Sequence, residues 1–131
     1  MLTLEVITPT GKALSVEAAT VTAPGVSGQF QVLDHHLPLL TILGSGSLSY
    51  EGAEGQKGGE VLIRGGVAEV SREGKVLVLT DEVQHLDKLD KERAQALKAA
   101  AEATLNGGYV DDATFERVHQ DLRFAEVVLS R

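Results

Sequence analysis

Residues 21–43, VTAPGVSGQFQVLDHHLPLLTIL, contain short apolar runs separated by Gly and Pro. Phe30 and Val32 alternate with polar residues, and Pro24-Gly25 interrupts the chain ahead of them. Apolar residues at every second position, bounded by turn-forming residues, are typical of β-strands with one buried face. The segment therefore predicts short strands joined by turns.

The same alternation extends from this segment in both directions. Toward the N-terminus it involves two sets of three apolar residues: Leu2, Leu4, Val6, Leu14, Val16 and Ala18. Toward the C-terminus, further apolar runs follow at residues 61–64, 67–71 and 76–80, with Gly-rich breaks between them. Strands and breaks at this spacing are typical of antiparallel sandwiches and barrels. Residues 1–85 are therefore predicted to form an all-β sandwich or barrel.

The composition changes after residue 86. Residues 89–105 are rich in Ala and Leu and lack Gly, Pro, Val and Ile, which favours a helix. We predict that this helix runs from about residue 87 to 105, with Asp87 as its N-cap. Asn106-Gly107-Gly108 supplies a left-handed stop at its C-terminal end.

A second helix is predicted after Asp111-Asp112. Apolar or small residues repeat on both helices at intervals of three and four: Phe115, Val118, Leu122, Ala125 and Leu129 on the second, Ala96, Ala100 and Ala103 on the first. This spacing predicts that residues 86–131 form a two-helix antiparallel hairpin. The seam is thin, and short isolated helices are marginal in water, so we expect the hairpin to lean on the sandwich or on a partner.

Composition argues against several classes of partner. Twelve Lys and Arg against nineteen Asp and Glu give a net charge of −7, which repels phosphate backbones, so no nucleic-acid partner is expected. The longest apolar run, residues 37–43, is far shorter than the roughly 20 residues that span a bilayer. The N-terminus also lacks the pattern of a signal peptide. We therefore expect no direct membrane insertion.

Common catalytic motifs are missing from the sequence. It contains no GxxxxGK[ST], GxSxG or HExxH pattern and no cysteine. His35 and His36 are neighbours that point to opposite sides of an extended chain, so they cannot easily share a metal ion. The Gly-rich stretch at residues 52–59 is interpreted as a hairpin turn. We expect no catalytic residues and no metal site.

One string of residues near the start of the first helix is a candidate site: Leu89-Asp90-Lys91-Glu92-Arg93-Ala94. Asp90 and Arg93 are three residues apart on one helix face, where the carboxylate can orient the guanidinium toward an anion or the polar edge of a base. Leu89 can cover an apolar ring, and Ala94 leaves room for close approach. The alternative is an ordinary ion pair in the first helical turn.

Three ordered motifs make the chain resemble the epsilon subunit of bacterial F-type ATP synthases. Residues 21–43 resemble the family's VxAPGxxGxFGVLPxHxPLLT, with Asp34 and His35 where Pro and Gly are usual. Residues 63–81 resemble xxxGGxxEV…VxVLAD, with Thr80 where Ala is common. LDKERA resembles [IL]DxxRA. The family pairs an N-terminal β-sandwich with a C-terminal helical hairpin, so the resemblance covers essentially the whole chain.

The resemblance implies a rotor subunit that does no bond chemistry itself and requires no cofactor. The sandwich, residues 1–85, is expected to bind the gamma subunit of the central stalk and to rest on the c-ring. The hairpin, residues 86–131, is expected to be regulatory. It can extend toward the alpha and beta catalytic subunits and inhibit ATP hydrolysis, while bound ATP favours its folded state. The expected location is peripheral, on the cytoplasmic face of a bacterial membrane.

The resemblance also implies two sets of site residues. The c-ring contact is expected at Asp34, His35 and His36. The nucleotide site is expected to combine residues from both helices: Leu89, Asp90, Arg93, Ala94, Arg117 and Arg123. The alternative function is a free-standing ligand-binding or adaptor domain with the same architecture, because fold alone does not determine function. A small hydrolase is disfavoured because no pairing of nucleophile and base is visible.

Overall fold

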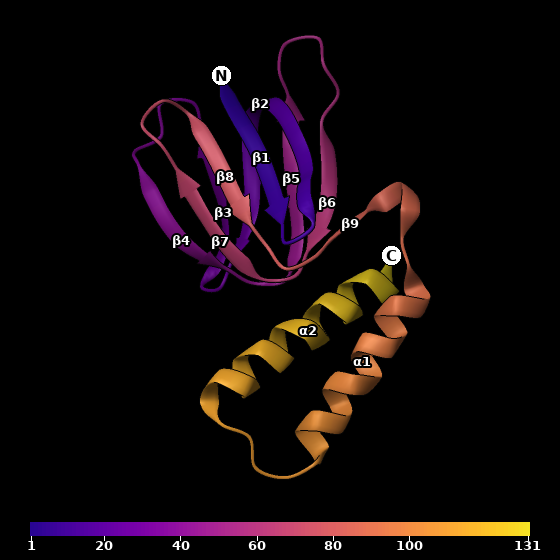
Figure 1. Ribbon diagram of the computed structural model, residues 1–131. Coiled ribbons are helices and arrows are strands. Elements are labelled where there is room, and N and C mark those ends of the chain that lie inside the picture. The colour runs from indigo at the N-terminus through magenta and orange to yellow at the C-terminus, as the bar shows by residue number, and fades with distance from the viewer.

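The computed structural model describes all 131 residues, as nine strands followed by a short 3₁₀ helix and two α-helices (Figure 1). The strands are β1 (Leu2–Thr8), β2 (Gly11–Gly25), β3 (Gly28–Leu33), β4 (Leu39–Leu43), β5 (Gly46–Gly52), β6 (Gly59–Ile63), β7 (Gly66–Val70), β8 (Lys75–Leu79) and β9 (Val83–His85). They form a β-sandwich, and the two α-helices lie as an antiparallel pair beside one end of it (Figure 1). The predicted fold class is confirmed.

Strand β2 joins the two layers of the sandwich. It is 15 residues long, and its first half pairs with β1 whereas its second half pairs with β3 and β5. One layer continues as β1-β8-β7-β4 and the other as β5-β6-β9. A register shift between Ala18 and Thr20, opposite β5, accompanies the change of partner.

The core between the layers is built from aliphatic side chains. Fifteen buried residues form one cluster, and the first strand contributes Leu2, Leu4 and Val6, all fully buried. Their alternation follows the period of two expected for a strand with one inward face. Gly66, at φ 126°, begins β7 where a Cβ would lie 1.9 Å from the Leu79 carbonyl oxygen, so only glycine permits this pairing.

The first α-helix begins later than the sequence predicts. Leu86–Lys88 form a separate 3₁₀ helix, η1, and Leu89 is extended at φ −67° and ψ 131°. The α-helix α1 spans Lys91–Asn106, and its N-cap is Asp90 rather than Asp87. The Asp90 Oδ1 accepts a hydrogen bond from the Arg93 amide at 2.9 Å. The prediction of Asp87 as N-cap is wrong because the extended Leu89 interrupts the helical backbone.

The contact faces of the two helices also differ from the predicted seam. Helix α2 spans Asp112–Ser130 and buries four residues: Val118, Phe124, Ala125 and Val128. Phe115 is 46% exposed, and the small side chains buried on α1 are Ala94 and Ala101 instead of Ala96, Ala100 and Ala103. A heptad seam assumes one partner, whereas α2 packs against both α1 and the sandwich, which rotates and widens its buried stripe.

A small second core connects the hairpin to the sandwich. Leu62 of β6 is fully buried together with Phe124 and Val128 of α2 and Ala94 of α1. The hairpin therefore leans on the sandwich, as the thin seam predicts. Neither α-helix has the length and apolar character needed to cross a bilayer.

Candidate functional site

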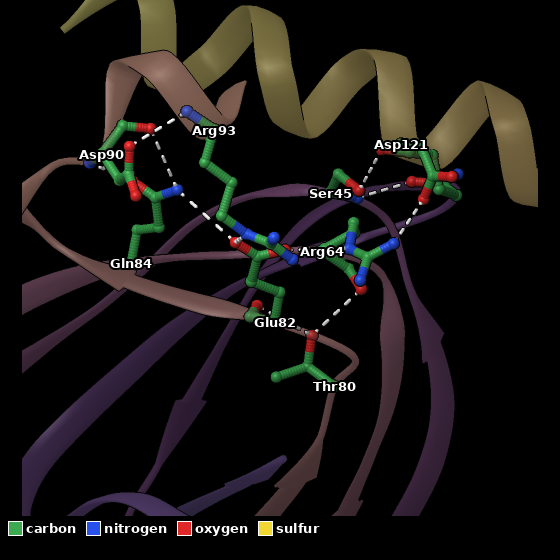
Figure 2. A network of polar contacts seen from close by, with 9 residues as sticks. Ser45, Arg64, Thr80, Glu82, Gln84, Asp90, Arg93 and Asp121 are labelled. Carbon is green, nitrogen blue, oxygen red and sulfur yellow. Dashed lines mark hydrogen bonds and ion pairs between the residues drawn. The ribbon is translucent and has the colours of Figure 1, made fainter. Parts of the chain in front are cut away.

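A polar network lies where the hairpin meets the end of the sandwich (Figure 2). Its centre is Glu82, which follows β8 and is only 12% exposed. The Glu82 carboxylate accepts two hydrogen bonds from the Arg93 guanidinium, from Nε at 2.6 Å and from Nη2 at 2.8 Å. Such a two-point pairing fixes geometry as well as charge. One carboxylate of the sandwich thus holds the first turn of α1.

Arg64 extends the network to the second helix. It lies in the turn between β6 and β7, and its Nη1 donates to Asp121 Oδ1 of α2 at 2.8 Å. The Thr80 hydroxyl donates to the Arg64 carbonyl at 3.0 Å. The Arg64 Nε is buried 3.5 Å from Glu82 Oε1 and has no hydrogen-bond partner. Arg64 is therefore hydrogen-bonded to α2, whereas its contact with Glu82 of the sandwich is only a longer ion pair.

The start of α1 is also tied to β9. The Asp90 amide donates to Gln84 Oε1 at 2.8 Å, and the Asp90 carboxylate caps the Arg93 amide. Asp90 was expected to orient the Arg93 guanidinium through its side chain, and that expectation is wrong. The Asp90 carboxylate accepts the backbone amide of Arg93 instead, and the guanidinium is held by Glu82.

Charge pairing shifts the ionisation of this cluster. Burial raises the pKa of Glu82, but hydrogen bonding to Arg93 and the charges of Arg93 and Arg64 outweigh it, so the pKa lies below its ordinary value. The hydrogen bonds that Arg93 donates to Glu82 in turn raise the pKa of Arg93. Because the folded pKa of Glu82 is depressed, its contribution to stability is present above the unfolded pKa and is lost as pH falls through the folded pKa. Glu82 and Arg93 therefore carry opposite charges at neutral pH.

A second contact between hairpin and sandwich involves Ser45, in the turn between β4 and β5. The Ser45 amide donates to Gln120 Oε1 at 2.6 Å, and the Ser45 hydroxyl donates to the Gln120 carbonyl at 2.7 Å. Arg131, at the end of α2, makes two hydrogen bonds to Glu60 of β6 at 2.6 and 3.1 Å. Apart from Leu62, the side chains that hold the hairpin to the sandwich are thus mainly polar.

The residues of the predicted nucleotide site are only partly brought together. Leu89, Asp90, Arg93 and Ala94 gather at the start of α1, but Ala94 is fully buried in the hairpin core. Arg93 borders a surface cavity of about 320 Å³ that Lys12 and Glu82 also line.

The two arginines of α2 do not join this cavity. Arg123 lines a different cavity, of about 330 Å³, together with Phe115 and His119. Arg117 is exposed on α2 and lines neither cavity. Sequence reasoning missed Glu82, Arg64 and Asp121, because nothing in their local spacing signals that strand turns and a distant helix bring them together.

The loop of Asp34, His35 and His36 lies between β3 and β4, at the end of the sandwich that holds the N-terminus (Figure 1). Asp34 pairs with the Met1 amine, and the His36 Nδ1 lies 2.6 Å from the Leu37 carbonyl oxygen. His35 has a φ of 64°, which is uncommon outside glycine. No three His, Asp or Glu side chains in the structure are grouped so that they could hold a metal ion.

An apolar row crosses the outer surface of one sheet layer. Ile42 of β4 pairs with Val67 of β7, and Val67 pairs with Leu79 of β8. Ile42 is 61% exposed, and Leu40, two residues before it on β4, is 71% exposed. We call these four residues, Leu40, Ile42, Val67 and Leu79, the apolar face. Contiguous exposed apolar side chains of this kind mark interaction surfaces.

Comparison with known sequences agrees with this architecture. Residues 1–85 match the family model of the ATP synthase Delta/Epsilon chain beta-sandwich domain. An ATP synthase epsilon chain of Geobacter metallireducens is 37% identical over 118 residues, 88% of this chain and 81% of the relative. ATP synthase epsilon chain 2 of Syntrophotalea carbinolica is 38% identical over 129 residues, covering 96% and 89%.

Comparison with solved structures gives the same result. A chain in the Euglena gracilis mitochondrial ATP synthase, in an OSCP/F1/c-ring structure, matches with a TM-score of 0.71 and 25% identity, covering 98% of this chain and 79% of that one. A chain in the Tetrahymena thermophila central stalk and c-ring structure has a TM-score of 0.61 at 13% identity, which shows the fold alone. The resemblance seen in the sequence motifs is confirmed: the chain belongs to the family of ATP synthase epsilon chains.

Proposed function

We propose that this chain is a non-catalytic rotor subunit of a proton-translocating ATP synthase, placed in the central stalk between the c-ring and the catalytic subunits. In this role the sandwich binds the gamma subunit and couples proton flow through the c-ring to ATP synthesis. Family membership supports the proposal, and the observation that carries it is the apolar face on a sandwich whose own core is already closed. Peripheral attachment at the cytoplasmic face of a bacterial membrane follows from this placement.

The apolar face is the proposed gamma-binding surface. Its four residues lie on β4, β7 and β8, whereas the hairpin packs mainly against β5 and β6. The sandwich could therefore stay bound to gamma while the hairpin moves. The direct test is reconstitution with gamma from the same organism, where a stable complex is expected. A chain that stays monomeric beside folded gamma would favour the alternative of a free-standing adaptor domain.

The hairpin is proposed to be mobile and to inhibit ATP hydrolysis when it extends toward the alpha and beta subunits. Support comes from the chemistry of the junction, in which Leu62 is the one sandwich residue of the shared apolar cluster. The other contacts are hydrogen bonds and ion pairs, and these exchange with water at small net cost. Interfaces of this polar kind favour reversible docking.

We expect the c-ring to contact the loop of Asp34, His35 and His36. This loop is at the end of the sandwich away from the hairpin, so the contact would survive hairpin movement (Figure 1). Since the chain has no cysteine, His36→Cys introduces a unique thiol. In assembled enzyme it should cross-link to the polar loop of the c subunit.

A matched control for this experiment is Ser27→Cys. Ser27 is exposed in the turn between β2 and β3, near the hairpin end of the sandwich. No c-ring product is expected from it. A product from Ser27→Cys alone would place the c-ring at the other end of the sandwich.

ATP is proposed as a regulatory ligand that binds through Arg93. A phosphate must compete with Glu82 for the guanidinium, so we expect binding only in the millimolar range. Arg93→Gln should weaken it by about 1.5–3 kcal/mol, the usual magnitude for a hydrogen bond to a charged group. Amide shifts of α1 during an NMR titration with ATP give the measurement.

Arg117→Gln is the control for the nucleotide titration. Arg117 is exposed and does not line the cavity beside Arg93, so its loss should change the affinity little. If millimolar ATP moves no amide of α1 in the unmodified chain, Arg93 has no nucleotide role. Equal losses in both variants would indicate general charge attraction instead.

A further inference from the structure

We propose that the Glu82 carboxylate binds the Arg93 guanidinium in place of an external anion. This pairing keeps the hairpin docked on the sandwich without any nucleotide. The inference rests on the proposed function only in giving the hairpin a mobile regulatory role. Four charged residues from four segments make up this contact, and we call them the latch: Arg64, Glu82, Arg93 and Asp121.

The geometry of Glu82 supports this assignment. Its carboxylate meets Arg93 at 2.6 and 2.8 Å through two nitrogens, which is how an arginine also holds a phosphate. Glu82 belongs to the segment between β8 and β9, so it is part of the sandwich, while Arg93 is part of α1. In the docked hairpin the Glu82 carboxylate therefore balances the charge of Arg93 and fixes its position, so no bound anion is needed for this.

Arg64 supplies the second half of the latch. In the docked hairpin its Nη1 is bonded to Asp121 of α2, and its buried Nε faces Glu82 without a hydrogen bond. Removal of the hairpin takes away both Arg93 and Asp121 together. Arg64 and Glu82 are then left side by side on the sandwich, already 3.5 Å apart, and a small movement completes their pairing.

In this arrangement the Glu82 carboxylate has an arginine partner both when the hairpin is docked and when it is undocked. Docked, Glu82 is bonded to Arg93 and Asp121 to Arg64. Undocked, Glu82 turns to Arg64, while Arg93 and Asp121 enter water with their helices. Leaving an uncompensated buried charge would make undocking costly, and this exchange of partners avoids it. The latch therefore holds the hairpin by a contact that can open and close reversibly.

Hydrogen exchange of the isolated 131-residue chain tests the latch directly. Without nucleotide, the amides of α1 should be protected, and adding millimolar ATP should leave their exchange rates within about twofold. Glu82→Gln should speed exchange in α1 by about 10-fold or more, because a charge-assisted pairing is lost. The strands β1 and β2, remote from the latch, should exchange as before and report that the sandwich is folded.

A double-mutant cycle separates the latch from a general structural effect. Arg93→Gln alone should match Glu82→Gln, and the double variant should exchange no faster than either single one. The control is Glu60→Gln, which breaks the other two-point ion pair between sandwich and hairpin, the one with Arg131 at the end of α2. Because the Glu60 side chain is 26% exposed whereas that of Glu82 is 12% exposed, exchange should rise at most about 3-fold.

Three outcomes would overturn the proposal: unchanged exchange in Glu82→Gln, additive effects in the double variant, or protection of α1 that appears only when ATP is added. None of these depends on ATP synthase assembly. Hydrolysis by the reconstituted complex is measured separately, and there Glu82→Gln should increase inhibition. If Glu82→Gln speeds hydrogen exchange in α1 but leaves hydrolysis unchanged, the inhibitory role of the hairpin is rejected. The proposal of the latch itself then still stands.

Discussion

Replacement of Phe124 by alanine should release the hairpin while the sandwich stays folded. Phe124 is fully buried and is the largest side chain in the cluster that joins both helices to Leu62. Removing a buried aromatic ring typically costs about 3–5 kcal/mol. Leu62 is the one sandwich residue in this cluster, so a loss of this size should exceed what holds the hairpin in place. Circular dichroism at the helical band, followed during heating, should show an early loss of helix in the variant.

The control for this experiment is Phe115→Ala, on the same helix. Phe115 is 46% exposed and stacks on His119, with ring centroids 6.0 Å apart, instead of entering the core. Its removal should leave the helical signal and the melting curve nearly unchanged. If Phe124→Ala unfolded the sandwich together with the hairpin, the two parts would form one cooperative unit. Hairpin mobility would then need a different origin.

Substitution of Ile42 by glutamate should prevent a stable complex with gamma. Ile42 lies in the middle of the apolar face, flanked by Leu40 on its own strand and by Val67 on the next. A carboxylate buried there by gamma would lose its hydration without gaining a partner. The expected loss is at least about 2 kcal/mol, roughly 30-fold in affinity, as for a central interface residue. Titration of gamma by calorimetry or light scattering gives the measurement.

Tyr109→Glu is the control for the gamma experiment. Tyr109 is 94% exposed in the connection between α1 and α2, outside the apolar face. It adds the same charge to the chain and should leave gamma affinity unchanged. Because Ile42 points away from the core, neither variant should lower the melting temperature of the sandwich. Normal gamma binding by Ile42→Glu would show that gamma binds another surface.

The strands could be predicted from the sequence because their pattern is local. Leu2, Leu4 and Val6 alternate with polar residues, and a strand with one inward face buries every second side chain. The closing of two layers through one long strand was not predictable in the same way. Strand β2 changes partners near Ala18, and that depends on which strands the rest of the chain supplies.

The helices show that a local sequence pattern can predict a helix without predicting which of its faces is buried. Their existence followed from the Ala-rich composition and from the glycines at residues 107 and 108. Their buried faces did not, since the heptad spacing of Phe115 and Val118 describes a helix with one partner. Phe124 is buried because α2 has two partners, and the second of these, the sandwich, is remote in sequence.

The candidate site, too, could be predicted from the sequence only in part. The sequence by itself determined the β-sandwich and the hairpin and indicated the segment around Arg93 as a candidate site, because alternation, composition and short motifs act between near neighbours. Only the tertiary structure decided that Arg93 is held by Glu82 and that Arg64 pairs with Asp121. Positions 64, 82 and 121 have no common spacing. They meet because the strand turns and the two docked helices share one end of the sandwich, and there a buried charge must find a partner wherever the fold supplies one.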